Sequence, residues 1–299
     1  MNTINISDKK IAKLSKFALS NHVFNTEGCI YDFDYRGKNK VLKILYNTDG
    51  VGFANKLYTI EMLNFYKNSL PVNFLCPDNL VSIGGKISGF TVPRFDGENL
   101  ADLLNDRTVT SKEKIYYLTK IGEVLNQLKS IRDYGSLKQI FLNDLHESNV
   151  MVNPINKEVA FIDLDSCRIL NNGSFPSRYL GPSHFIENNP HKYIFNKDGN
   201  GAGYVVANEN SDLFCYNVII LNYLFGSSIT RLIPDDFYNY LNYLEKLKFN
   251  KHLLDSFNRL TLTCDNENPS IYLEGITEEQ VGRAKKIVFD KCIGKGIQN

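Results

Sequence analysis

The sequence lacks an excess of charge of either sign. Its 299 residues include 34 Lys and Arg and 33 Asp and Glu, a formal net charge of +1 with His neutral. Proteins that bind nucleic acids or anionic membrane surfaces usually carry a clear basic excess. The charge balance supports neither class of partner, and we expect no nucleic-acid and no membrane binding.

The sequence also lacks closely spaced cysteines. No two of its six cysteines form a C-x-x-C pair, so the pattern indicates no structural zinc site. An even count in a chain of this length does not imply disulfides, and we expect free thiols, as in a reducing cytoplasm. The six are Cys29, Cys76, Cys167, Cys215, Cys264 and Cys292.

Long apolar runs are missing as well. The most apolar stretch, residues 213–225, is too short to span a bilayer and contains Asn217 and Asn222, so we expect a buried helix there. The first residues, MNTINISDKKIAKLSKF, have no apolar core of the kind that a signal peptide needs. The sequence therefore predicts a cytoplasmic protein.

The organisation of the chain changes near residue 95, and we find no internal repeat. Residues 28–35 and 40–46 are β-rich and flank a Gly-containing turn, which is typical of a hairpin. A helical pattern around residues 57–65 follows, and then a second pair of strands at 81–85 and 87–95. Residues 1–95 are thus predicted to form a small β-rich unit.

Longer helical patterns dominate after residue 95. Residues 98–106 are expected to form a short helix and 111–131 a long one, with Thr110 or Ser111 as its N-cap. A strand-loop-strand unit at 140–166 follows, then a loop rich in Gly, Asn and Pro from about 171 to 210, and then further helices from about Asp212. The predicted fold class is α+β, with a larger, mainly helical unit at residues 96–299.

Three polar residues in the strand-loop-strand unit carry the chemistry. Asp144 is followed five positions later by Asn149, and Asp163 ends the next apolar strand. Phosphoryl transfer from ATP requires a carboxylate that orients the attacking hydroxyl, a neutral oxygen ligand for Mg²⁺, and a second carboxylate for Mg²⁺. Asp144, Asn149 and Asp163 supply these groups in that order.

This segment resembles the catalytic loop of the protein-kinase superfamily. The family pattern H-R-D-L-x-x-x-N followed by D-F-G appears here as L-N-D-L-H-E-S-N at 142–149 and D-L-D at 163–165. The D-L-H-x-x-N form is similar to bacterial and phage members and to small-molecule kinases of the same superfamily. The resemblance implies ATP and Mg²⁺ as cofactors and a two-lobed fold, with residues 1–95 as a β-rich N-lobe and 96–299 as a helical C-lobe.

The resemblance extends over about residues 23–226. V-L-K, ending at Lys43, resembles the strand that carries the nucleotide-binding lysine, and Glu61 lies where a helix glutamate would pair with it. Residues 92–100 resemble the hinge that contacts adenine, and Asp212 resembles the aspartate that braces the catalytic loop. The resemblance implies these site residues: catalytic Asp144, Lys43, Glu61 and His146; nucleotide-binding Gly28, Ile30, Val41, Lys43, Val92, Arg94 and Met151; and metal-binding Asn149 and Asp163.

Several positions depart from the family pattern. Leu142 and Asn143 replace the histidine and arginine of the loop, and only Gly28 remains of the glycine-rich loop, with Asn25 at an earlier glycine position. His146 stands where a lysine is usual; either it contacts the transferred phosphate or it only orders the loop. Asp165 replaces the D-F-G glycine; it is either an additional metal ligand or an ordinary exposed carboxylate.

The acceptor of the phosphoryl group is left open by the sequence. A long interval between Asp165 and Asp212, rich in Asn and Gly, favours a protein Ser or Thr substrate, since small-molecule kinases of this superfamily generally shorten this region. The alternatives are a small-molecule kinase, similar to aminoglycoside or choline kinases, and a catalytically silent nucleotide-binding scaffold. Because Asn143 cannot form a charge pair with a phosphate, we expect activity without activation-segment phosphorylation. The sequence does not indicate which oligomeric state the protein adopts.

Overall fold

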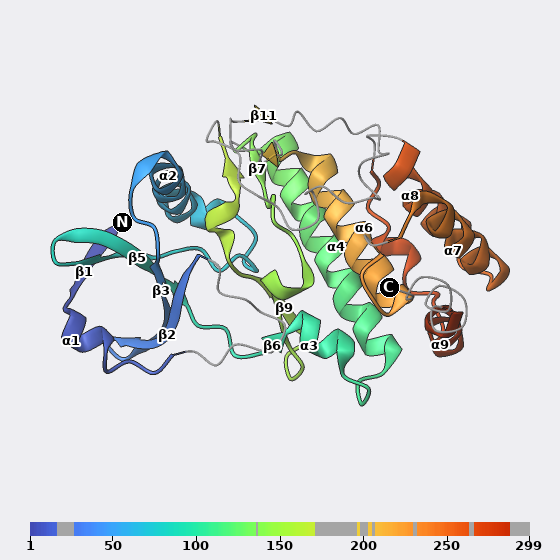
Figure 1. Ribbon diagram of the computed structural model, residues 1–299, viewed down its shortest axis with the longest axis horizontal. Helices are drawn as coiled ribbons and strands as arrows, with labels where there is room; N and C mark the ends of the chain where they lie inside the picture. Colours follow the sequence, from blue (N-terminus) through green and yellow to red (C-terminus); the bar gives the residue numbers. More distant parts are fainter. Residues whose placement is uncertain are drawn as a thin grey trace, which may run out of the picture.

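The N-terminal part of the chain is built on a five-stranded sheet (Figure 1). The order of its strands is β1-β4-β5-β3-β2, and β1 pairs with β4 in parallel while the other pairs are antiparallel. The computed structural model describes residues 1–16, 27–135, 137–170, 196–197, 203–204, 207–229, 232–262 and 266–287. The five strands are β1 (Asn2–Ile6), β2 (Gly28–Tyr35), β3 (Lys38–Leu45), β4 (Asn79–Ile83) and β5 (Lys86–Pro93).

The predicted hairpin is confirmed, with a tighter turn than expected. Arg36 and Gly37 connect β2 to β3 and both have positive φ, at 56° and 74°. Two such residues match the twist of the flanking strands, which is why two-residue turns of this kind dominate in hairpins. The second strand consequently begins at Lys38 rather than at residue 40. The second predicted strand pair is confirmed as β4 and β5.

Both faces of the sheet are covered. Helix α2 (Gly50–Tyr66) lies against one face, where Ile60 packs in a buried apolar cluster with Leu45, Leu80 and Phe90. On the other face, Leu42 is fully buried in a second cluster with residues of β1, β2 and β4. Side chains alternate between the two faces of a strand, so Lys43 shares the α2-facing side with Leu45.

The rest of the chain is mainly helical. Helices α4 (Ser111–Tyr134) and α6 (Glu209–Phe225) lie side by side at the centre of this part (Figure 1). The Thr110 hydroxyl accepts a hydrogen bond from the Glu113 N–H at 3.2 Å, which confirms the expected N-cap. The other elements are α1 (Asp8–Ile11), η1 (Lys67–Ser69), α3 (Leu100–Asn105), η2 (Glu147–Asn149), η3 (Leu164–Ser166), α7 (Pro234–Lys246), α8 (Lys251–Leu262), η5 (Ser270–Tyr272) and α9 (Glu278–Ile287).

Helix α6 is buried on nearly all sides, as its apolar sequence predicts. Val218, Ile219 and Leu221 are fully buried, and so is Asn217, whose amide donates to the Leu213 carbonyl at 2.9 Å. Among the described residues, no helix has both the length and the apolar composition needed to cross a lipid bilayer. The chain is therefore mixed α and β in its described residues, in agreement with the predicted α+β class.

Short strands connect the sheet to the helices. Strand β8 (Val150–Asn153) pairs with β6 (Glu98–Asn99) and with β9 (Glu158–Phe161). Residues 73–75, which follow α2, run beside β9: Phe161 N–H donates to the Asn73 carbonyl at 2.8 Å, and Leu75 N–H donates to the Phe161 carbonyl at 3.1 Å. The remaining short strands are β7 (Ile140–Phe141), β10 (Arg168–Ile169), β11 (Asn196–Lys197) and β12 (Gly203–Tyr204).

Three further predictions fall partly outside the described residues. The expected loop at 171–210 is described only at 196–197, 203–204 and from residue 207 onward. Asn25 lies outside as well, whereas Gly28, the remaining glycine of the expected nucleotide-covering loop, is described. Of the six cysteines, Cys264 and Cys292 are not described, while Cys29, Cys76, Cys167 and Cys215 are free thiols, as predicted.

Candidate functional site

Lys43 is held on an inner strand of the sheet. In the ladder, Ile30 of β2 stands opposite Lys43, and Val92 of β5 stands opposite Val41. Directly opposed residues point to the same face, and Val41 is two positions from Lys43. The structure thus brings Ile30, Val41, Lys43 and Val92, four residues expected to bind nucleotide, onto one face of the sheet.

The Lys43 ammonium is surrounded by carboxylates. It pairs with Asp163, with Asp165 Oδ1 at 3.1 Å and with Glu27 Oε2 at 3.6 Å, and its side chain is only 10% exposed. Burial by itself lowers the pKa of an ammonium, but the charges of Asp163, Asp165 and Glu27 outweigh it, so the pKa of Lys43 is raised. Lys43 is therefore a permanent cation.

Asp165 lies between two ammonium groups. Its side chain has no exposed surface, and its Oδ2 is 2.8 Å from the Nζ of Lys56 on α2. Burial opposes ionisation of Asp165, but Lys43 and Lys56 overcome it and hold the pKa of this carboxyl below its usual value. Lys56 also contacts Glu27, with Nζ 2.6 Å from Oε2. Asp165 is thus a buried anion, and the expectation of an ordinary exposed carboxylate is wrong.

Asp163 begins η3 in the left-handed conformation, with φ 57° and ψ 38°. Asp and Asn adopt this conformation more readily than most residues, and it marks a sharp turn directly after β9. Its side chain is 36% exposed, and its Oδ1 meets Lys43. Desolvation, opposed by Lys43 and reinforced by the charge of Asp165, raises the pKa of Asp163 to about 6.

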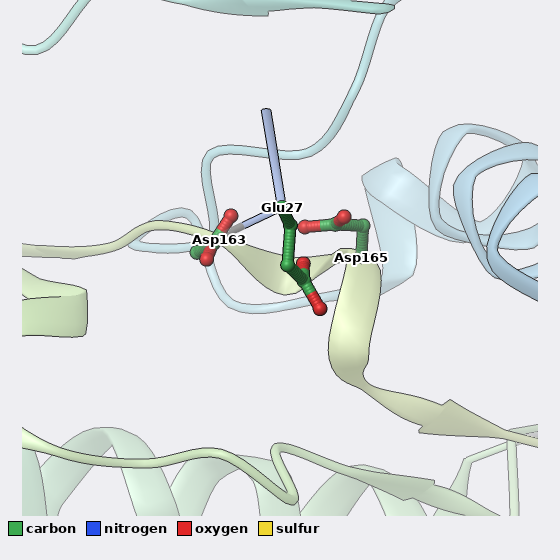
Figure 2. Close-up of side chains that lie close together, drawn as sticks. All are labelled: Glu27, Asp163 and Asp165. Atoms are coloured by element: carbon green, nitrogen blue, oxygen red, sulfur yellow. The ribbon is translucent and has the colours of Figure 1, made fainter. Parts of the chain in front are cut away.

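Three carboxylates form a cluster that could hold a metal ion. One oxygen each from Glu27, Asp163 and Asp165 lies within 4.8 Å of the others (Figure 2). Hard cations such as Mg²⁺ prefer oxygen ligands of this kind. Asp163, the most accessible of the residues expected to bind metal, belongs to this cluster, whereas Asn149 is held in the neighbouring loop. Glu27 is the member that the sequence did not indicate.

Asp212 of α6 holds the loop that carries Asp144 through two hydrogen bonds. The carboxylate of Asp212 accepts hydrogen bonds from the N–H groups of Leu142 and Asn143, both at 3.0 Å. Asn143 has a φ of 61° and is 1% exposed, so the chain turns sharply just before Asp144. Burial raises the pKa of Asp212 to about 7, against the two N–H donors that favour its anion. The expected bracing role of Asp212 is thereby confirmed.

Asp144, His146 and Asn149 are connected within this loop. The Asn149 amide donates to the Asp144 carbonyl at 2.9 Å, and Asn149 O accepts from Ile162 N–H at 3.0 Å, which sets Asn149 beside the residue before Asp163. His146 Nδ1 accepts from the Ser148 N–H at 3.2 Å, and its Nε2 is 3.7 Å from Asp144 Oδ2. These contacts favour the second interpretation of His146, that it orders the loop.

The predicted pairing of Lys43 with Glu61 is corrected by the structure. Successive residues of an α-helix are 100° apart, and the residues of α2 that reach the site are Lys56 and Thr59. Glu61 follows Thr59 by two residues, which places it on the opposite side of α2, and it is exposed. Lys43 is balanced by Asp163, Asp165 and Glu27 in place of Glu61. No pattern in the sequence indicated Lys56, because its contact depends on the burial of Asp165, which is a result of packing.

The other predicted nucleotide-binding residues have mixed outcomes. Arg94 pairs with Asp32 of β2 and lies 3.6 Å from Asp96, so its side chain stabilises the connection after β5. Met151 lies on β8, opposite Ala160 of β9, and is partly buried. Gly28 approaches β3 so closely that a Cβ there would lie 2.3 Å from the Ile44 carbonyl oxygen. Gly28 is thus required by strand packing.

A cavity elsewhere in the helical part touches this site at a single residue. It has a volume of about 280 Å³ and lies between α4, α6 and residues 266–268, with Asp212 in its lining.

No protein-family model matches the chain, and no curated protein matches its sequence.

Proposed function

We propose that the chain is an ATP- and Mg²⁺-dependent phosphotransferase with a two-lobed, protein-kinase-like fold. In this proposal residues 1–95 are the N-lobe and 96–299 the C-lobe, and the γ-phosphoryl group of ATP moves to a hydroxyl. The observation that carries it is the meeting of Lys43 with Asp163 next to the loop of Asp144 and Asn149. A buried lysine, an accessible carboxylate and a braced catalytic loop are the parts that phosphoryl transfer needs.

The sheet face around Lys43 suits a nucleotide. Ile30, Val41 and Val92 present apolar side chains on the same face as the Lys43 ammonium. Nucleotide sites combine an apolar surface for the base with a few charged groups for the phosphates. The segment after β5, where Arg94 pairs with Asp32, would then supply backbone groups to the adenine edge.

The remaining roles follow from the charges. Asp163 and Asn149 would hold Mg²⁺, which neutralises phosphate oxygens when it is bound. Lys43 would turn from Asp163 toward the α- and β-phosphates while keeping its contact with Asp165. Asp144 would orient the attacking hydroxyl and accept its proton, as the bond from the hydroxyl oxygen to phosphorus forms and the bond from phosphorus to the ADP oxygen breaks.

The proposal also concerns the molecule that accepts the γ-phosphoryl group. We favour Ser or Thr of a protein, because the interval between Asp165 and Asp212 is long, although most of it lies outside the described residues. A small-molecule hydroxyl is the alternative within the same chemistry. A scaffold that binds nucleotide without transferring phosphate is the alternative outside it.

Labelled ATP and Mg²⁺ separate these outcomes. The purified chain is incubated alone, with cell extract, and with aminoglycosides or amino-alcohols, alongside Asp144→Asn as the inactive control. We expect labelled protein bands with the wild type only. A labelled small molecule would replace the protein acceptor, and thermal stabilisation by ATP without turnover would replace the enzyme by a scaffold. No response to ATP in any assay would overturn the proposal.

A further inference from the structure

We propose that Lys56 is a positioning residue of this site, fastening α2 to η3 through Asp165 and thereby holding Lys43 in place. The family resemblance implies that an anionic residue of α2, Glu61, holds Lys43. In this structure α2 instead supplies a cation, Lys56, which binds the anion Asp165 of η3. The measurement of nucleotide binding rests on the proposed function. The contacts of Lys56 with Asp165 and Glu27 do not depend on that function.

The first observation is the burial of the pair. Asp165 is 0% exposed and the Lys56 side chain is 14% exposed, with 2.8 Å between Oδ2 and Nζ. Lys43 contacts both oxygens of the same carboxylate, at 3.1 and 3.2 Å. A buried charge that loses one partner is strongly destabilised, because nothing replaces the water it gave up. Asp165 therefore fixes the positions of both ammonium groups.

A second contact fastens the same face of α2 to the same turn. Thr59, three residues after Lys56, is fully buried. Its hydroxyl lies 3.1 Å from the Asn55 carbonyl oxygen of its own helix and 3.4 Å from the Cys167 carbonyl oxygen, so its one proton is shared between these two acceptors. Residues three apart on a helix are neighbours on its surface. Lys56 and Thr59 thus contact residues 165 and 167 from the same face of α2, and rotation or sliding of α2 would disturb both contacts.

Asp165 would remain beside Lys43 if Asp163 were engaged elsewhere. A cation bound by Asp163 would draw this carboxylate away from Lys43, and Glu27 is 3.6 Å away and 38% exposed. Asp165 then remains as the enclosed anion beside Lys43. Because two ammonium groups already occupy its oxygens, Asp165 acts as an anchor for lysines and does not need to be a metal ligand.

The experiment compares two residues of the same helix. Lys56→Met and Glu61→Met both remove a charge from α2, and Lys56→Arg retains the cation in case Lys56→Met does not fold. The readouts are the dissociation constant of Mg²⁺-ATP, and hydrogen exchange of the α2 and η3 amides without nucleotide. The second readout needs no nucleotide binding, so it tests the inference even if the proposed function fails.

We expect Lys56→Met to weaken Mg²⁺-ATP binding by about tenfold or more, as loss of one partner of a buried pair implies. The same variant should exchange α2 and η3 amides faster, while Lys56→Arg and Glu61→Met stay close to the wild type. Asp165→Asn combined with Lys56→Met should weaken binding no more than Asp165→Asn alone, because the two residues act as one unit. Unchanged exchange in Lys56→Met, or the same loss in Glu61→Met, would overturn the inference.

Discussion

Lys43 on β3 and Asp163 at the start of η3 form an ion pair although 120 residues separate them in the sequence. The pair joins the sheet of the N-terminal part to the turn that follows β9. In this pair the charge of the buried lysine is balanced by that of a partly exposed carboxylate. A Mg²⁺-nucleotide would supply each of them with a new partner of opposite charge.

Lys43→Ala should reduce ATP turnover by orders of magnitude. The change also leaves Glu27, Asp163 and Asp165 with less positive charge near them, so Mg²⁺ should raise the melting temperature of the variant more than that of the wild type. A coupled ATPase assay and thermal unfolding with and without Mg²⁺ measure both effects. Lys38→Ala, an exposed position on the same strand, is the control; near-normal turnover in Lys43→Ala would remove Lys43 from the site.

Asp144→Asn and Asp163→Asn should differ in a metal titration. Asp144→Asn retains the size of the side chain but loses its capacity to accept a proton, so Mg²⁺-ATP affinity should persist while transfer collapses. Asp163→Asn removes a charged oxygen ligand, so nucleotide affinity should lose its dependence on Mg²⁺. The check is calorimetric titration with ATP at several Mg²⁺ concentrations. If both variants gave the same metal dependence, the two assigned roles would be wrong.

Asp212→Asn should destabilise the protein and flatten part of its pH dependence. An amide has one acceptor oxygen for the two N–H donors of Leu142 and Asn143, and a buried unpaired donor costs about 1–3 kcal/mol. The pKa of Asp212 is about 7 in the folded state and near the usual value of about 3.9 when unfolded.

Because the pKa of Asp212 is higher in the folded than in the unfolded state, its contribution to folding stability decreases as the pH rises. Between about pH 4 and pH 7 the folded state holds the extra proton, so this group's contribution to stability is full below pH 4 and is lost as pH rises to 7. Urea unfolding at pH 5 and pH 7.5 should therefore show a smaller pH difference for Asp212→Asn than for the wild type. A pH difference equal to that of the wild type would show that Asp212 is ionised throughout.

Activity should not depend on phosphorylation of the chain. Asn143 is buried, and its amide donates to the Ser166 carbonyl at 3.3 Å, so the loop before Asp144 is tied to residue 166 by a neutral hydrogen bond. No positive charge stands at this position to receive a phosphate. Turnover after phosphatase treatment, with removal of phosphate verified by mass spectrometry, should equal turnover before it. Loss of turnover with the phosphate would contradict the prediction.

Gly28→Ala should destabilise the sheet, by about 1–3 kcal/mol, because the new Cβ would meet the Ile44 carbonyl oxygen and force the strands apart. Gly52→Ala is the matched control. A Cβ at Gly52 meets open space on α2, and Ala is favoured over Gly in a helix by about 0.5–1 kcal/mol. Urea unfolding should move in opposite directions for the two variants; a Gly28→Ala protein as stable as the wild type would show that the strands can separate at no cost.

Local patterns predicted most of the elements that position the site. The hairpin of β2 and β3, helix α4 with its Thr110 cap, and the loop from Leu142 to Asn149 all depend on residues that are close in sequence. The bracing by Asp212 was expected only through the family resemblance, since 69 residues separate it from Asn143. Strand β1 was not predicted, because its parallel pairing with β4 joins residues that lie far apart in the chain.

The charges around Lys43 show where sequence reasoning failed. The family resemblance implies a carboxylate on α2, and Glu61 is the one at the expected distance from Lys43. Whether a helix residue faces the site depends on the rotation of the helix, and here Lys56 and Thr59 face the site through their contacts with residues 165 and 167. The burial of Asp165 could not be predicted either, because it depends on packing between α2 and η3.

The hydrogen bonds of residues 73–75 with β9 have a mechanical consequence. The N-terminal part and the helical part are joined by these bonds, by the polypeptide between β5 and β6, and by the contacts of α2 with residues 165 and 167. Displacement of one part from the other must therefore break hydrogen bonds at two separate segments, α2 and residues 73–75.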